Sequence, residues 1–239
     1  WKKLMEDGVE ADVISAEDSL NAYKLIIVPM LFMLKDNIAQ NLTDFVDEGG
    51  IVLVTYMTGY VNENCLAYQG GFPGDDLSNL VGVISEEIDT LYPSDKNGVR
   101  VTEDDAVWEV KDYAEVLRVN DAEVLGRYID DFYKDMPALT CKEYGLGKAY
   151  YQAARCSLSQ MTGFFKKLLK EAKIEAKELP AGIEFHKRYG TDGVYEFYLN
   201  ISEKAVTLEN ICGVNMLSGD RIEGTVLLEP KGYLVVKVD

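Results

Sequence analysis

The chain has 239 residues, of which 47% are hydrophobic, and it carries 41 acidic against 24 basic residues. A formal charge of −17 argues against nucleic acid or an anionic membrane surface as a partner, because both would repel the protein. No apolar run reaches the roughly 20 residues that a membrane-spanning helix needs, and no signal-like segment opens the sequence. We therefore expect a soluble, cytoplasmic protein.

The first residues predict a helix that begins upstream of residue 1. Residue 1 is Trp rather than Met, and Trp1, Leu4 and Met5 recur at helical spacing before Gly8, a residue type that commonly ends helices. We therefore expect the chain to start inside a helix, with further sequence preceding it. Residues 9–15 then predict a short strand.

The best-patterned stretch, residues 23–56, predicts two buried strands joined by a helix. Residues 25–28 and 51–54 are uninterrupted apolar runs, as is typical of parallel strands covered on both faces. Asp36 is suited to cap the helix, and Gly49 to end it in a left-handed conformation. Four apolar residues recur at helical spacing between the strands: Ile38, Leu42, Phe45 and Val46. This pattern predicts an α/β domain with a mainly parallel sheet flanked by helices.

A long passage without helix or strand pattern follows, over residues 57–76. Loops of this length inside compact domains are usually functional or poorly ordered. The passage contains three aromatic residues, Tyr60, Tyr68 and Phe72, so a functional role is a reasonable hypothesis. A short helix is predicted directly after it, at residues 77–80.

The next segment, residues 86–120, is acidic and weakly patterned. We interpret it as an insertion of short strands around Val99 and Trp108, followed by a strand at residues 122–128. Farther along, two strand-like runs flank Gly145 and Gly147, a turn that suits a hairpin with a β-bulge.

The clearest helix is predicted at residues 157–174. Ser157 and Gln160 have the spacing of a capping box at its start. Five apolar residues form one broad face, as expected of a helix that covers a core: Met161, Phe164, Phe165, Leu168 and Leu169.

After Pro180 and Gly182 the pattern changes to short alternating segments separated by turns. These segments predict a small antiparallel β-domain over residues 182–239. The predicted strands are residues 183–188, 194–200, 205–208, 213–217, 225–228 and 232–238. A domain of this size rarely stands alone, so we expect it to accompany a larger one.

No catalytic residue is predicted. An open parallel sheet can carry a hydrolase-like site, but this needs a nucleophile on the sharp turn after a central strand, with a histidine base nearby. The turn at residues 55–59 reads Thr-Tyr-Met-Thr-Gly and offers neither cysteine nor serine. The lone histidine, His186, lies in the predicted β-domain and is better interpreted as a surface or structural residue.

No cofactor or metal site is predicted either. Gly145-Leu146-Gly147 lacks the rest of a dinucleotide fingerprint, and acidic pairs such as Asp75-Asp76 are expected by chance in a chain with 41 carboxylates. The cysteines are too widely separated for a zinc knuckle or a redox pair, so reduced thiols are expected. They are Cys65, Cys141, Cys156 and Cys212.

Five short phrases stand out along the chain. They are YKLIIVPM at 23–30, FVDEGG at 45–50, GGFPG at 70–74, DDFY at 130–133 and YGLGKA at 144–149. In this order they resemble family 42 β-galactosidases, and the closing β-domain is similar too. The resemblance covers essentially the whole chain and corresponds to the part of those enzymes that follows the catalytic (β/α)8 barrel.

The resemblance implies a trimerisation domain over residues 1–178, with a flavodoxin-like or class I amidotransferase-like fold that lacks the nucleophile, and a β-domain over residues 182–239. In that family two carboxylates on the barrel perform retaining hydrolysis of terminal β-D-galactosides, and neither position exists in this chain. The implied role is therefore non-catalytic assembly. The implied partners are other copies in a homotrimer, the upstream barrel of the same protein and, in the intact enzyme only, the galactoside.

The resemblance also suggests where contacts form, because neighbouring protomers of that family pack through this domain and help to wall the substrate entrance. We therefore expect Tyr56, Tyr60 and Phe72 near that interface or entrance, since aromatic side chains supply contact area with few rotatable bonds. The alternative is that these rings fill the core of their own domain.

A second interpretation of the whole chain is a free-standing α/β binding or regulatory protein with an amidotransferase-like fold and no nucleophile. The expected start inside a helix favours the assembly module over this alternative.

Overall fold

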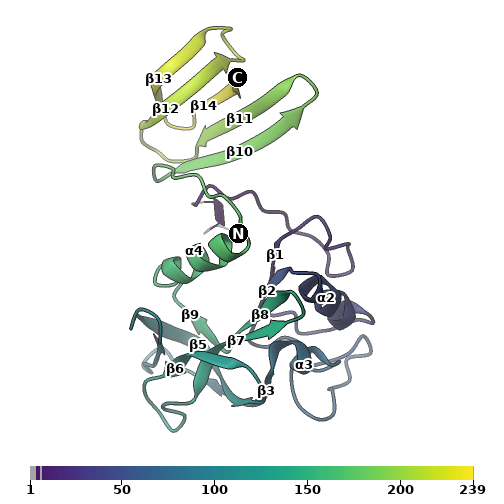
Figure 1. Ribbon diagram of the computed structural model, residues 1–239. Coiled ribbons are helices and arrows are strands. Elements are labelled where there is room, and N and C mark those ends of the chain that lie inside the picture. The colour runs from purple at the N-terminus through teal and green to yellow at the C-terminus, as the bar shows by residue number, and fades with distance from the viewer. Residues whose placement is uncertain (1–3, 6, 239) are drawn as a thin grey trace. The chain divides into compact units, whose positions relative to one another are not determined.

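The computed structural model describes residues 4–5 and 7–238, so Trp1, which is expected to belong to the first helix, lies outside the described residues. Its contacts divide the chain into two units (Figure 1). The first unit comprises residues 15–173, and the second joins the described residues before Ser15 to those from Ile174 onward. The described residues at the start of the chain thus group with the C-terminal sheet.

The first unit is built on a nine-stranded mixed sheet with the order β1-β2-β8-β7-β6-β4-β5-β3, and β9 pairs with β5. The strands are β1 Leu25–Val28, β2 Ile51–Thr55, β3 Val83–Thr90, β4 Gly98–Val101, β5 Val107–Val119, β6 Glu123–Tyr128, β7 Pro137–Tyr144, β8 Gly147–Gln152 and β9 Ala154–Cys156. Only the β1–β2 and β2–β8 pairs are parallel. The prediction of a mainly parallel sheet is therefore wrong, because the later strands add to the sheet as antiparallel hairpins.

The predicted strand–helix–strand unit is confirmed. Helix α2, Ile38–Asp47, buries the expected apolar face against the sheet. Gly49 has a φ of 105°, and its N–H donates to Val46 O at 3.0 Å while that of Gly50 donates to Phe45 O at 2.9 Å. This is the Schellman arrangement that favours glycine after a helix. The predicted cap is wrong, because the helix begins after Asn37 and no side chain caps it.

The acidic segment after residue 86 forms longer strands than predicted. Strand β5 has 13 residues, and its register with β9 shifts between Lys111 and Ala114. The β7–β8 hairpin is confirmed, but it has no bulge: Tyr144 pairs with Gly147 across a two-residue turn. Gly145 adopts a φ of 54° there, a conformation that suits glycine in tight hairpins.

The unit contains two further helices, α3 at Leu77–Val81 and α4 at Thr162–Glu171. Figure 1 shows α2 and α4 on either side of β1, β2 and β8. Phe164 of α4 contacts Tyr150 of β8 and Trp108 of β5, with ring centroids 5.6 and 5.5 Å apart. The predicted capping box is absent, because Gln160 Oε1 instead accepts a 2.7 Å hydrogen bond from the N–H of Glu109.

The second unit contains a five-stranded antiparallel sheet with the order β10-β11-β14-β12-β13. The strands are β10 Ile183–Gly190, β11 Gly193–Asn200, β12 Val206–Asn215, β13 Arg221–Leu228 and β14 Tyr233–Val238. Two of the predicted strands, 205–208 and 213–217, belong to the single strand β12. An irregularity between Leu208 and Ile211, with Asn210 at a φ of 57°, breaks the alternation there.

Residues 9–15 form no strand, contrary to the prediction. Glu10 instead accepts hydrogen bonds from the N–H of Lys187 and from Arg188 Nη1, the latter at 3.1 Å. Partial burial opposes ionisation of Glu10, but these donors and His186 outweigh it and lower its pKa. His186 lies between two carboxylates, with Nε2 2.8 Å from Glu184 and Nδ1 3.5 Å from Glu10.

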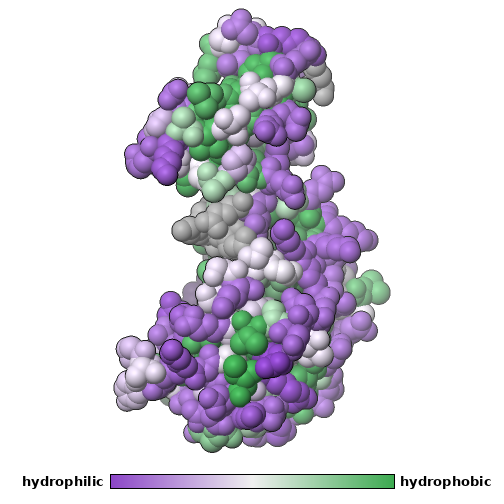
Figure 2. Space-filling model, turned by 90° about the vertical axis from the view of Figure 1, so that its left-hand side faces the viewer, coloured by the Kyte–Doolittle hydropathy of each residue, from purple (hydrophilic) through white to green (hydrophobic). Residues whose placement is uncertain are grey.

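No helix within the described part of the chain is long and apolar enough to cross a membrane. On the face shown in Figure 2, hydrophilic residues predominate, and hydrophobic residues form separate patches among them.

Candidate functional site

The turn after β2 lies at the carboxyl end of the parallel strands, where a hydrolase-like nucleophile would be placed. Met57 occupies this turn with a φ of 57°, a left-handed conformation that is unusual for a non-glycine residue. Its N–H donates a 2.8 Å hydrogen bond to Glu115 Oε1. A methionine side chain carries no nucleophile for acyl transfer. The turn therefore has the sharp backbone of a nucleophile-bearing turn but no group that could attack a substrate.

Glu115 is fully buried and is the centre of a hydrogen-bond network. Tyr60 OH donates to its Oε1 at 2.7 Å, and Tyr151 OH donates to its Oε2 at 2.6 Å. Tyr128 OH donates to its backbone carbonyl at 2.9 Å. Burial raises the pKa of Glu115, and the hydrogen bonds from Tyr151, Met57 and Tyr60 oppose this rise. Because all these donors come from the protein interior, Glu115 organises the turn and is not open to a substrate.

Three aromatic rings stack beside this network. Tyr60 lies 4.0 Å from Phe72 and 5.4 Å from Phe32 between ring centroids, with interplanar angles of 12° and 11°. We call Phe32, Tyr60 and Phe72 the aromatic stack. Both faces of Tyr60 are therefore covered, while Phe32 is 45% exposed.

The structure brings together two of the three residues predicted for this region. Tyr60 and Phe72 are in contact, whereas Tyr56 is 8% exposed and packs at 6.1 Å against Tyr113. Sequence reasoning missed Phe32 and Glu115. A signal for Phe32 was present, because it follows the first parallel strand and so emerges at the same end of the sheet as the turn after β2.

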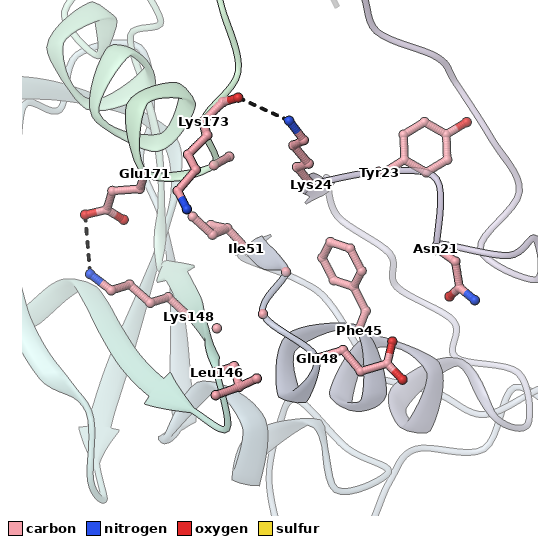
Figure 3. Close-up of a pocket in the computed structure, with 14 residues that line it drawn as sticks. Asn21, Tyr23, Lys24, Phe45, Glu48, Ile51, Leu146, Lys148, Glu171 and Lys173 are labelled. Atoms are coloured by element: carbon pink, nitrogen blue, oxygen red, sulfur yellow. Dashed lines mark hydrogen bonds and ion pairs between the residues drawn. The ribbon is translucent and has the colours of Figure 1, made fainter.

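A separate pocket of about 620 Å³ lies at the opposite, amino end of the parallel strands (Figure 3). It has an apolar wall and five charged side chains. Its lining includes Phe45, Ile51, Leu146, Lys24, Lys148, Lys173, Glu48 and Glu171. Figure 3 shows the Lys148 and Glu171 side chains facing one another, and Nζ and Oε1 are 3.4 Å apart.

Three of the five charged side chains of the pocket, those of Lys24, Lys148 and Glu171, bind partners within the protein. Glu171 also accepts a 2.5 Å hydrogen bond from Tyr150 OH, and burial together with this carboxylate raises the pKa of Tyr150. Lys24 Nζ donates to the carbonyl of Lys173 at 3.3 Å. These contacts connect α4 and the residues just after it to β8 and to the residue before β1. The charged side chains that make them therefore have a role in holding the fold together.

The described residues contain no group of three or more His, Cys, Asp or Glu side chains placed to hold a metal ion. Cys141 and Cys156 are buried and Cys65 and Cys212 exposed, all as free thiols. Burial raises the pKa of Cys141 to about 11 and that of Cys156 to about 12, so neither supplies a thiolate at neutral pH.

A family model described as the β-galactosidase trimerisation domain matches residues 1–175. The β-galactosidase Pbg of Clostridium perfringens is 33% identical over 99% of the chain and 36% of its own length. The crystal structure of a β-galactosidase from Bacillus circulans sp. alkalophilus superposes with a TM-score of 0.94 at 29% identity, covering 100% of this chain and 36% of that one. A catalytic mutant of Gan42B, a GH42 β-galactosidase from G. stearothermophilus, gives 0.92 at 32% identity, covering 99% and 35%.

The chain thus spans about a third of the length of these relatives. The matched model includes the whole of the first unit, with its mixed sheet, aromatic stack and pocket. The sequence match and the shared fold agree over the same residues. The chain therefore belongs to the trimerisation-domain region of the family 42 β-galactosidases.

Proposed function

We propose that this chain is the non-catalytic assembly portion of a β-galactosidase that hydrolyses terminal β-D-galactosides by a retaining mechanism. Its partners would be two further copies in a homotrimer and an upstream catalytic barrel of the same polypeptide, which also supplies the galactoside site. The observation that carries the proposal is the trimerisation-domain match over residues 1–175. The β-galactosidase names of the longer relatives support the activity of the whole protein.

The carboxylates of the first unit support the absence of catalysis from the chain alone. Retaining hydrolysis needs two carboxyl groups about 5 Å apart that both face the substrate. Glu115, the only buried carboxylate among the described residues, is enclosed by Tyr60, Tyr151 and the turn at Met57. Glu171 is engaged by Tyr150 and Lys148. Neither group is free to attack or protonate a glycoside.

Tyr56, Tyr60 and Phe72 are part of this proposal as residues near the subunit interface or the substrate entrance. Tyr56 and Tyr60 would act indirectly, because Tyr56 is buried and both faces of Tyr60 are covered. Phe72, at the end of the stack, is half-buried and could contribute directly. We also propose a domain boundary near residues 178–182. A cytoplasmic location would suit the four free thiols, and we propose it on that ground.

Size-exclusion chromatography with light scattering, combined with a galactoside-hydrolysis assay, tests this function. The full-length polypeptide should be a trimer that hydrolyses the galactoside, and residues 1–239 alone should show no hydrolysis. A monomeric full-length protein would contradict the assembly role. Hydrolysis by the 239-residue chain would contradict the location of catalysis.

The alternative, a free-standing binding or regulatory protein, is tested by the same pair of measurements. It predicts a native polypeptide no longer than the chain, without galactoside hydrolysis. The 36% coverage of the longer β-galactosidase relative favours the assembly portion.

A further inference from the structure

The loop after β1 carries two exposed apolar side chains. Met30 is 41% exposed and Phe32 is 45% exposed. The preceding strand β1 is the terminal strand of the sheet, and Leu25, Ile26 and Ile27 are each only half-buried. Partly exposed apolar side chains therefore lie both on this edge strand and in the loop that follows it, and edge strands favour association with another chain.

The backbone of this loop is fixed by hydrogen bonds to the turn after β2. Two threonine hydroxyls of that turn accept from the loop, and backbone groups on both sides complete the connection. The bonds are Met30 N–H to Thr55 Oγ1 (2.9 Å), Leu31 N–H to Thr58 Oγ1 (3.2 Å), Tyr60 N–H to Phe32 O (2.9 Å) and Leu34 N–H to Val61 O (2.9 Å). A contact made by such a loop loses little backbone entropy on binding.

The Phe32 ring is also held in place. One of its faces lies against Tyr60, whose other face stacks on Phe72 and whose hydroxyl donates to the buried Glu115. The exposed area of Phe32 is thus presented from a rigid base. Preorganised aromatic side chains with exposed area are typical anchors of protein interfaces.

We infer that Met30 and Phe32 are the anchors through which one copy of this chain packs against a second copy in the trimer, and that Tyr60 positions Phe32. The inference rests on the proposed assembly function and names the surface that performs it. The occupant is a second copy because the trimerisation-domain match spans this loop. The other strongly exposed apolar residues of the unit lie on separate elements or turns: Leu66, Tyr92, Val107, Phe132, Leu146 and Leu158.

The test uses the full-length polypeptide, with subunit dissociation followed by light scattering over a dilution series. Phe32→Ser should weaken association by about 30-fold or more, the size of effect expected of an interface anchor. Met30→Asn provides a second variant, because Asn tolerates the left-handed φ of 48° at this position. Phe132→Ser is the matched control, since Phe132 is 66% exposed and lies outside the aromatic stack. It should leave association unchanged.

Folding and positioning have separate readouts. Phe32→Ser loses the stacking on Tyr60 but no fully buried group, so it should lower the unfolding midpoint of the unit by only about 2–4 °C and leave the unit folded. Tyr60→Phe removes only the hydroxyl and should weaken association several-fold in the wild-type background, but not when Phe32 is already Ser. Equal effects of Tyr60→Phe in both backgrounds would contradict the positioning role.

The possible outcomes distinguish a failure of this inference from a failure of the proposed assembly function. The inference would be overturned if the wild type is a trimer and the Phe32→Ser and Met30→Asn variants form trimers of the same affinity. The proposed assembly function would then still stand. A monomeric wild type would remove both. Dissociation of the two loop variants, with an intact Phe132→Ser trimer, would support the inference.

Discussion

Tyr60 OH donates a 2.7 Å hydrogen bond to Oε1 of Glu115, a residue 55 positions away in the sequence. The bond joins a partly buried aromatic residue to the only buried carboxylate among the described residues. The long loop at residues 57–76 is therefore anchored in the core, although it contains no regular strand of the sheet.

The two tyrosines on Glu115 should differ in their contribution to stability. Tyr151→Phe removes the hydroxyl that donates to Oε2, whereas after Tyr60→Phe the Oε1 atom still accepts from the N–H of Met57. We expect Tyr151→Phe to lower the free energy of unfolding by about 1–3 kcal/mol, and Tyr60→Phe to lower it by less. Urea unfolding measures both, with Tyr92→Phe, at a 73% exposed residue, as the control. A larger loss for Tyr60→Phe would contradict the network.

Glu115→Gln should change how stability depends on pH. Burial raises the folded-state pKa of Glu115 above its ordinary value of 4.5. The contribution of its protonated form is therefore fully present below pH 4.5 and is lost as the pH rises through the raised folded-state value. Gln does not titrate, so wild type should lose stability relative to Glu115→Gln as the pH increases. Thermal melts of both proteins between pH 4 and 8 would show this, and a pH-independent difference would exclude it.

Gly147 and Gly163 should respond in opposite directions to replacement by Ala. A Cβ at Gly147 would lie 2.1 Å from Gly50 O and 2.4 Å from Val46 O, both backbone atoms that cannot move aside. We expect a loss of about 1–3 kcal/mol or more for Gly147→Ala. At Gly163, in helix α4, the nearest atom is 3.8 Å away, so Ala should stabilise by about 0.5–1 kcal/mol. Denaturant unfolding compares the two, and similar losses at both positions would contradict this account.

In the second unit, Lys177→Met should make the stability of the sheet less dependent on acid pH. Lys177 Nζ donates to Glu196 Oε2 at 2.8 Å and lies 4.4 Å from the centre of the Phe185 ring. Burial opposes ionisation of Glu196, but Lys177 and Tyr198 outweigh it and lower its pKa. The resulting stability is present above the ordinary pKa of 4.5 and is lost as the pH falls through the lowered value.

Removing Lys177 should therefore reduce stability near pH 7 and weaken its dependence on acid pH in this unit. Thermal unfolding from pH 7 to pH 3 is the measurement, with Lys166→Met on the exposed part of α4 as the control. Identical pH profiles for wild type and Lys177→Met would contradict a role for the pair.

The sequence predicted best where local periodicity decides the structure. The uninterrupted runs at residues 25–28 and 51–54 became β1 and β2, and Gly49 ended α2 as expected. Strand β5 was underestimated because its alternation is interrupted: the register shifts after Lys111, and Asp112 has a φ of 42°. The proportion of parallel strands was overestimated because, in the first unit, only the parallel strands at residues 25–28 and 51–54 have continuous apolar runs. The antiparallel strands of that unit have interrupted patterns and were less visible in the sequence.

For the candidate site, the sequence drew attention to a loop rich in aromatic residues, but not to the buried residue that supports it. Tyr60 and Phe72 lie 12 residues apart in the sequence and stack on one another in the structure. Glu115 is one of 41 acidic residues, and only the tertiary fold distinguishes it by burying it. The predicted capping box failed for a similar reason, because Gln160 accepts a hydrogen bond from a distant strand.

Residues 15–173 are inserted within the second unit, whose described residues lie on both sides of that segment in the chain. Contacts such as Glu10 with Arg188 therefore enclose the whole first unit in one loop of the polypeptide. For an unstructured loop of this length, closure costs about 4–5 kcal/mol. A first unit that is already folded can hold the two ends of this loop at a fixed separation, so we expect the order of folding to run from the inserted unit to the one that surrounds it.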